Sequence, residues 1–223
     1  MYDFTSGFLT LMQQELFTHG NNQLETCIRV PLPGADVSYY PDFLSADQAQ
    51  HYFNRLQDTL LWRQEQIQLY GKQFKVPRLQ AWYGNKEASY RYSNLSLYPN
   101  TWTTELLSLK QRCEQISATV FNSVLANLYR DGQDSMGKHA DDESELGRQP
   151  VIASLSLGAM RTLVFSHKHN LSEPKKQNVK LPLATGSLLI MKGSTQQNWL
   201  HGIAKRKTPM AGRINLTFRF IYP

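Results

Sequence analysis

Two histidines and one aspartate have the residue types and spacing that a metal centre requires. His139 and Asp141 are separated by one residue, so on an extended chain both side chains point the same way and can bind one ion. This pair alone predicts little, because 6 His and 18 acidic residues among 223 give about half of one such pair by chance. His201 supplies a third ligand, and two His with one carboxylate form a facial triad that leaves open positions on Fe(II).

The C-terminal segment from Arg213 to Phe220 alternates polar and apolar residues. On a strand, this pattern places Arg213 and Arg219 on one face and an apolar stripe on the other. Such a polar face is also typical of an ordinary strand exposed to solvent. Beside a His-Asp-His set, however, two guanidiniums fit the two carboxylates of a small diacid bound at the metal. A zinc hydrolase is the alternative use of the same three ligands, and it has no comparable need for two arginines.

The composition limits the class of protein. A chain of 223 residues with 41% apolar residues is long enough for one good core and short for two. We therefore expect a single domain over residues 31–223, preceded by an N-terminal extension over residues 1–30. The net charge of +6 suits a polyanionic partner without requiring one.

The sequence also indicates where the protein resides. Two isolated cysteines, Cys27 and Cys113, favour a reducing compartment over a disulfide framework. The N-terminus lacks a basic segment followed by an apolar one, and the apolar run from Leu188 to Met191 is too short to span a bilayer. We expect a soluble monomer that is not secreted and has no membrane partner, cytoplasmic in a bacterium and nuclear in a eukaryote.

Two helices are predicted in the first half of the chain. Ser45 is a suitable N-cap for a helix that continues to about Leu61, because apolar residues recur there on one face. A second helix follows Pro99, with Thr103 or Thr104 as its cap and an apolar stripe over residues 106–120. Residues 8–17 show a looser helical pattern.

Short strands dominate the rest of the chain. Alternating residues predict hairpin arms at 66–70 and 88–92, and further strands at 123–129, 151–157, 162–165, 179–183, 187–191 and 213–221. Many short strands separated by Gly and Pro, with two flanking helices, are typical of a β-sandwich or jelly roll. The polar, basic segment 167–180 is predicted to be an exposed loop.

Six motifs resemble those of one known family in both type and order. They are Asn127 to Gly132, Gly137 to Glu143, Ser154 to Gly158, Gly186 to Leu189, Trp199 to His201, and the Arg-x-Asn-x-Thr-x-Arg ending at Arg219. On these motifs the chain resembles the AlkB family of nucleic-acid dealkylating dioxygenases, and most of all its members that repair double-stranded DNA. The similarity covers about residues 41–222, and the ordered set is far more specific than any single motif.

The resemblance implies a fold, cofactors and a reaction. The implied fold is a double-stranded β-helix, a jelly-roll variant, with Fe(II) held by His139, Asp141 and His201. The residues implied to bind 2-oxoglutarate are Asn127, Tyr129, Arg213, Asn215, Thr217 and Arg219. Tyr129 and Arg213 would hold its distal carboxylate, while Arg219 and Asn127 would lie nearer the end that chelates iron. With O2, this chemistry hydroxylates the alkyl carbon on a base nitrogen, and the unstable product releases an aldehyde.

The resemblance also predicts residues that recognise the substrate. Tyr92 matches the family's stacking aromatic, and Asp142 matches the carboxylate that reads an exocyclic amine; both suit the positive charge of 1-methyladenine and 3-methylcytosine. Tyr70 falls where relatives place an aromatic finger that fills the gap left by a flipped base, although a simple cover of the core is its alternative role. The further substrate contacts predicted are Gly71, Lys72, Tyr90, Arg91, Glu143, Arg206 and Lys207, with nucleotide-recognition hairpins over about residues 63–98.

Several cationic side chains are candidate phosphate contacts, which would position DNA without specifying its sequence. They are Arg161, Lys168, Lys175, Lys176, Lys180, Lys205, Arg206 and Lys207. We therefore expect alkylated DNA as the substrate and RNA as a second candidate. A catalytically silent nucleic-acid-binding module with the same fold is the alternative from another class, and the intact triad and arginine pair argue against it.

Overall fold

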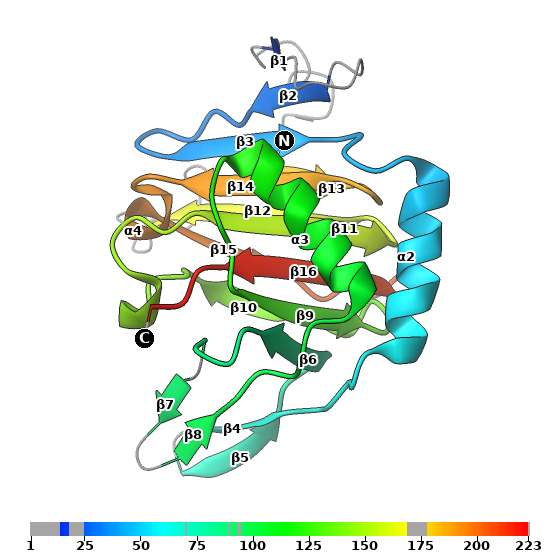
Figure 1. Ribbon diagram of the computed structural model, residues 1–223, viewed down its shortest axis with the longest axis vertical. Helices are drawn as coiled ribbons and strands as arrows, with labels where there is room; N and C mark the ends of the chain where they lie inside the picture. Colours follow the sequence, from blue (N-terminus) through cyan, green and yellow to red (C-terminus); the bar gives the residue numbers. More distant parts are fainter. Residues whose placement is uncertain are drawn as a thin grey trace.

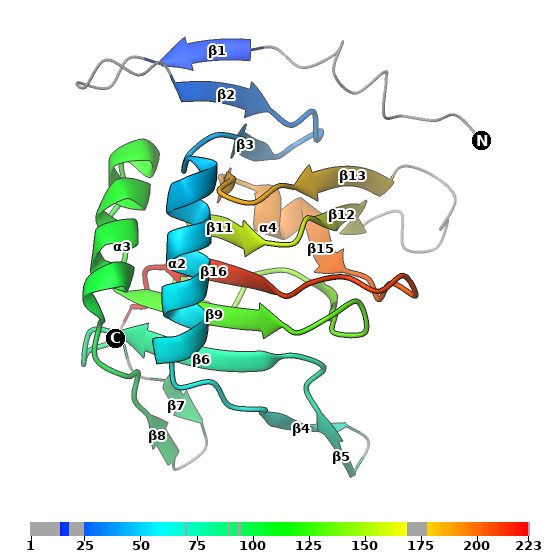
Figure 2. The same cartoon turned by 90° about the vertical axis from the view of Figure 1, so that its right-hand side faces the viewer.

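The computed structural model describes residues 14–17, 25–69, 71–88, 90–92, 95–168 and 178–222, with the backbone alone at 14–17, 25, 67, 69, 90–92 and 95–97. Two antiparallel sheets form the body of the protein, and two helices cover the outer side of the larger sheet (Figures 1 and 2). The prediction of a mainly β, jelly-roll fold with flanking helices is confirmed.

The chain crosses repeatedly between the two sheets, as in a jelly roll. The larger sheet has the order β1 (Gln14–Phe17), β2 (Glu25–Arg29), β3 (Asp36–Tyr40), β14 (Leu188–Lys192), β11 (Ile152–Gly158), β16 (Arg213–Arg219), β9 (Ser123–Tyr129) and β6 (Leu79–Gly84). The smaller sheet has the order β10 (Met136–His139), β15 (Trp199–Ile203), β12 (Arg161–His167) and β13 (Asn178–Leu183). This crossing brings residues that are distant in sequence to adjacent strands.

The larger sheet is buried on both faces. In β14, Leu188 and Ile190 belong to the core beneath the helices, whereas Leu189 and Met191 belong to a second core with side chains of the smaller sheet. Side chains alternate between the two faces of a strand, so a strand covered on both sides needs a continuous apolar run. This explains the run Leu188 to Met191 without any membrane role.

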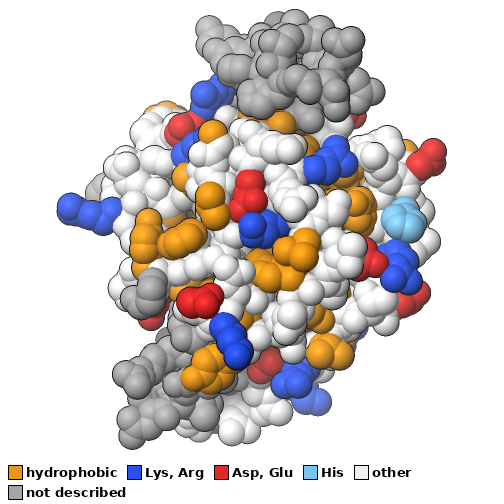
Figure 3. Space-filling view, viewed as in Figure 1, with side chains coloured by type: hydrophobic (Ala, Val, Ile, Leu, Met, Phe, Trp, Pro, Cys, Tyr) orange, Lys and Arg blue, Asp and Glu red, His pale blue; other side chains and the backbone are white. Residues whose placement is uncertain are grey.

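Helices α2 (Ala46–Thr59) and α3 (Thr104–Ser117) form where the sequence predicts them. Ser45 caps α2 in a capping box with Gln48, and the side chain of Thr103 accepts a hydrogen bond from the backbone of Leu106 in α3. Their outer face mixes apolar and charged side chains (Figure 3). In the described part of the chain, no helix is long and apolar enough to cross a membrane.

Two small hairpins extend beyond the edge strand β6 (Figure 1). One pairs β4 (Gln66–Leu69) with β5 (Lys72–Lys75), and the other pairs β7 (Tyr90–Tyr92) with β8 (Leu95–Leu97). Both lie within the range where nucleotide-recognition hairpins are predicted, and that role stays a prediction. Two short helical segments, η1 (Ser144–Leu146) and α4 (Thr195–Asn198), flank the residues of the candidate site.

The helical prediction for residues 8–17 is wrong where the structure can test it. Gln14–Phe17 is strand β1, which pairs with β2, and β2 in turn pairs with β3. Residues 8–13 lie outside the described residues. A short segment adopts the backbone that its neighbour can pair with, and this tertiary effect overrides a weak local pattern.

Candidate metal centre and its surroundings

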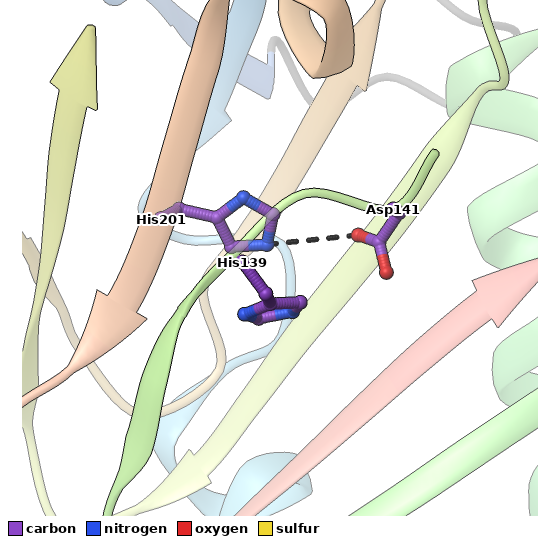
Figure 4. A group of neighbouring side chains, drawn as sticks. All are labelled: His139, Asp141 and His201. Atoms are coloured by element: carbon purple, nitrogen blue, oxygen red, sulfur yellow. Dashed lines mark ion pairs between the residues drawn. The ribbon is translucent and has the colours of Figure 1, made fainter. Parts of the chain in front are cut away.

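The three predicted metal ligands lie together, with His139 and His201 in the smaller sheet and Asp141 in the segment just after β10 (Figure 4). His139 ends β10 and pairs directly with His201, the central residue of β15. Their ring centroids are 4.4 Å apart, and His201 Nε2 lies 3.6 Å from Asp141 Oδ2. One ligand atom from each residue lies within 4.8 Å of the others. This is a suitable spacing for three ligands around one ion.

The protonation states of this group suit a metal. Burial lowers the pKa of His201 to about 4, so its imidazole is neutral and able to ligate at neutral pH. Burial opposes ionisation of Asp141, but Arg219 and the two imidazoles together hold its pKa below the usual value. Asp141 Oδ2 and His201 Nδ1 are buried without a hydrogen-bond partner among the described residues. A cation bound between the three side chains would complete the interactions of Asp141.

Two further contacts orient the ligands. His139 Nδ1 lies 3.1 Å from the carbonyl oxygen of Gly137, which leaves Nε2 as the ligating atom. The backbone N–H of Asp141 donates to Gln196 Oε1 over 3.0 Å, and Gln196 is buried in α4. Sequence reasoning missed Gln196, because nothing in its type or spacing distinguishes it from an ordinary polar residue of a short helix.

The polar face of β16 is largely buried, which excludes the alternative of an ordinary exposed strand face. Arg213 is only 2% exposed, and its Nη2 donates to Ser156 Oγ over 2.9 Å. Its Nε and Nη1 have no partner among the described residues. Arg219 binds Asp141 through Nη2, and its Nε is likewise unpartnered within the described chain. Burying a guanidinium without an anion costs several kcal/mol, so this face fits a bound dianion.

The neighbouring strand β9 completes this polar face. In register, Tyr129 lies opposite Arg213 and Asn127 opposite Asn215. Asn215 donates to Ser154 Oγ and accepts from Thr217 Oγ1, so these two candidate residues are already partnered.

Asn127 differs from them in having a free donor. Its Oδ1 accepts from Arg78 Nε over 2.7 Å and from Gln80 Nε2 over 3.1 Å. Its Nδ2 is buried without a partner among the described residues. Arg78 and Gln80 were not predicted, because they come from β6 and the segment before it and meet Asn127 only through sheet pairing.

The predicted substrate contacts whose side chains are described lie at the protein surface. Asp142 and Glu143 are exposed directly after the ligand Asp141, and Asp142 Oδ2 lies 2.8 Å from Lys168 Nζ. The remaining described contacts are also exposed, namely Gly71 and Lys72 in the β4–β5 hairpin and Arg206 and Lys207 between β15 and β16. Tyr90, Arg91 and Tyr92 form β7, of which only the backbone is described, and Tyr70, Lys175 and Lys176 lie outside the described residues.

One predicted phosphate contact is wrong. Arg161 is only 1% exposed, and its guanidinium donates to three backbone carbonyls inside the protein. It cannot reach a phosphate on bound DNA. Lys180 and Lys205 are exposed, and Lys168 pairs with Asp142.

Comparison with known proteins places the chain in a family. Residues 36–219 match the sequence model of the 2OG-Fe(II) oxygenase superfamily. The human protein named alpha-ketoglutarate-dependent dioxygenase alkB homolog 3 is 41% identical over 192 residues, which cover 84% of this chain and 66% of that protein. The human DNA oxidative demethylase ALKBH2 is 39% identical over 194 residues, covering 84% and 74%. The solved structure of OsALKBH1 shares the fold, with a TM-score of 0.61 and 18% identity over 86% of this chain and 99% of that one.

The chain belongs to the AlkB family within the 2OG-Fe(II) oxygenase superfamily. It spans slightly less than two thirds of the length of alkB homolog 3. The family is named for its use of Fe(II) and 2-oxoglutarate, and the His-Asp-His group of this chain fits such a metal.

Proposed function

We propose that this chain removes alkyl groups from damaged DNA bases by Fe(II)- and 2-oxoglutarate-dependent oxidation. The proposed lesions are 1-methyladenine and 3-methylcytosine, with RNA as a second candidate substrate. The observation that carries this proposal is a group of three metal ligands in contact with β16, a strand that carries two guanidiniums whose N–H groups are partly without partners among the described residues. The relatives named DNA oxidative demethylases support DNA as the substrate class.

The residues have distinct tasks in this proposal. His139, Asp141 and His201 would hold Fe(II), which with 2-oxoglutarate supplies the activation of O2 needed to oxidise an alkyl carbon. Arg213 offers two free N–H groups to the distal carboxylate of 2-oxoglutarate, beside the phenol of Tyr129. Arg219 holds Asp141 in its ionised form and keeps one N–H group free, as does Asn127.

Recognition of the damaged base would begin with Asp142. Its exposed carboxylate follows the ligand Asp141 directly, so a base bound there lies close to the metal. A positively charged methylated base is attracted to this carboxylate, and it would compete with Lys168 for the same oxygen. Because the ligands His201 and Asp141 are buried, a base within a duplex has to leave its stack to reach them.

The proposal can be tested by following methyl loss from an oligonucleotide that contains 1-methyladenine. We expect loss only when Fe(II), 2-oxoglutarate and O2 are all present. A zinc hydrolase would act with Zn²⁺ and would not respond to 2-oxoglutarate, and a silent binding module would bind the oligonucleotide without changing its mass. Either of these two results would contradict the proposed function.

Replacing Gln196 with leucine is expected to lower the metal affinity about 10- to 100-fold, the usual effect of removing a group that orients a ligand. Leucine removes the acceptor of the Asp141 backbone N–H and leaves that donor buried. The measurement is a titration of the metal-free protein with Mn²⁺. Gln197→Leu is the matched control, because Gln197 lies next to it in α4 and is exposed. Equal metal affinity in the Gln196 variant and the wild type would remove Gln196 from the support of Asp141.

Replacing Tyr70 with alanine is expected to depress repair of duplex DNA much more than repair of the same lesion in a single strand. Only a duplex leaves a hole when the base flips, and an inserted aromatic ring offsets part of an unstacking cost of a few kcal/mol. The measurement compares initial demethylation rates on the two substrates. Equal losses would indicate a general role in folding or base binding, and no loss on either substrate would make Tyr70 a bystander.

A further inference from the structure

Arg161, the first residue of β12, ties together two loops at one end of the site. Its Nη1 donates to the carbonyl of Asp131 over 3.1 Å, and its Nη2 donates to the carbonyls of Asp134 and Ala204 over 2.9 and 2.7 Å. The first two carbonyls belong to the loop 130–135 between β9 and β10. The third belongs to the loop 204–212 between β15 and β16. A single buried side chain therefore fixes both loops.

These two loops set the positions of Tyr129 and Arg213. Loop 130–135 begins directly after Tyr129, and loop 204–212 ends directly before Arg213. Tyr129 and Arg213 are paired in register across β9 and β16. The guanidinium carbon of Arg161 lies 5.6 Å from the centroid of the Tyr129 ring, and that of Arg213 lies 5.2 Å from it. Arg161 is thus a neighbour of the pair assigned to the distal carboxylate.

The two loops also pack closely against each other. The backbone N–H of Arg206 donates to the carbonyl of Gly132 over 2.7 Å, and Gln133 Nε2 donates to the carbonyl of Arg206 over 2.9 Å. A Cβ atom at Gly132 would lie only 2.7 Å from the Arg206 carbonyl oxygen, which is too close for any residue but glycine. A shift of either loop would therefore be transmitted to the other.

The charges in this region favour an anionic ligand. Arg161 and Arg213 are both buried, and both guanidiniums lie near the ring of Tyr129. Asp131 and Asp134 are nearby carboxylates, set against the cations Arg130, Arg161, Arg206 and Arg213, and Arg130 already holds Asp134 with hydrogen bonds of 2.7 and 2.8 Å. Positive charge therefore remains in excess among the described residues of this region, and a carboxylate bound at Arg213 would balance it.

We propose that Arg161 is a positioning residue for the distal carboxylate of 2-oxoglutarate, acting through Tyr129 and Arg213. This inference rests on the function proposed above. Nη1 and Nη2 of Arg161 already donate to backbone carbonyls, so we do not assign Arg161 as a ligand of the co-substrate. It fixes the two strand ends that carry the ligands and adds a second buried positive charge beside them.

The test compares two 2-oxo acids that differ only at the distal end. 2-Oxoglutarate has a carboxylate there, whereas 2-oxopentanoate has a methyl group and the same chelating end. Their dissociation constants are measured by calorimetry on the full chain loaded with Mn²⁺, for wild type, Arg161→Gln and Arg161→Lys. Arg112→Gln is the matched control. Like Arg161, Arg112 donates to a backbone carbonyl, that of Phe43, and its guanidinium lies over an aromatic ring, that of the same Phe43. It lies in α3, on the other face of the larger sheet.

In Arg161→Gln we expect the dissociation constant of 2-oxoglutarate to rise about tenfold, roughly the weight of one charged hydrogen bond. The dissociation constant of 2-oxopentanoate should stay within about twofold of wild type, because this ligand lacks the distal carboxylate that the positive charge of Arg161 attracts. Arg161→Lys keeps the charge but cannot hold both loops with one planar group, so we expect a smaller rise. Arg112→Gln should change neither constant.

Three results would overturn the role of Arg161. They are an unchanged 2-oxoglutarate affinity in a folded variant, an equal loss for both ligands, and failure of both variants to fold, which would make Arg161 a purely structural residue. A wrong assignment of the co-substrate site itself would give a different result from these three. If wild type bound both acids equally well, and Arg213→Gln made no difference, the assignment of the distal carboxylate to this end of the site would itself be wrong.

Discussion

Replacement of His201 by alanine is expected to reduce both iron affinity and demethylation to near background while the protein stays folded. The substitution removes one of three metal ligands, and a facial triad has no spare protein ligand to replace it. The apolar cores lie in other residues, so the fold should persist. Iron content after loading, demethylation rate and the thermal unfolding curve are the three measurements.

His51→Ala is the matched control for this prediction. His51 is exposed on α2, and its ring contacts Tyr52 edge-on. Iron content and activity should therefore remain at the wild-type level in the control. Wild-type demethylation by the His201 variant would refute the assignment of the metal ligands.

Arg213→Lys is expected to weaken 2-oxoglutarate binding roughly 10- to 100-fold, which corresponds to about 1.5–3 kcal/mol for a charged hydrogen bond. Lysine keeps the positive charge but loses the planar pair of donors, and Nε and Nη1 are the two groups that lack a partner in the described structure. The measurement is the dependence of the demethylation rate on 2-oxoglutarate concentration.

DNA binding provides the control for Arg213→Lys. Arg213 is buried, so it has no surface to offer to a phosphate, and the affinity for the oligonucleotide should change little. An unchanged dependence of the rate on 2-oxoglutarate would exclude Arg213 from the co-substrate site.

The metal ligands could be predicted because they lie in short motifs that follow one another in a recognisable order along the chain. His139 and Asp141 share a motif, and the alternation in β16 fixes which side chains share a face with Arg213. The same alternation could not show that this face is buried. Burial depends on the second sheet, which packs against it only after the chain has crossed between the sheets.

The supporting residues were not predictable, because their contacts join distant parts of the chain. Gln196 reaches Asp141 across 55 residues, and Arg161 reaches Ala204 across 43. From sequence, Arg161 was a surface charge suited to a phosphate, since a guanidinium is rarely buried. Only the structure reveals the carbonyl groups that stabilise it inside.

Strand β10 is another case in which pairing decides the structure. Met136-Gly137-Lys138-His139 has no alternating pattern and contains a glycine, so local propensity gives no strand signal. It becomes a strand because it pairs with β15, which places His139 directly opposite His201. The geometry of the metal ligands therefore depends on a strand that the sequence does not reveal.

The most direct test of the proposed function is a single experiment on the full chain with a 1-methyladenine oligonucleotide. The protein is loaded anaerobically with Fe(II) and 2-oxoglutarate, oxygen is then added, and the mass of the oligonucleotide is followed. We predict no change before oxygen is added, and loss of the methyl group with formation of succinate and formaldehyde afterwards. An oligonucleotide that binds but keeps its methyl group after oxygen is added, while the loaded protein holds both iron and 2-oxoglutarate, would contradict the proposed demethylation.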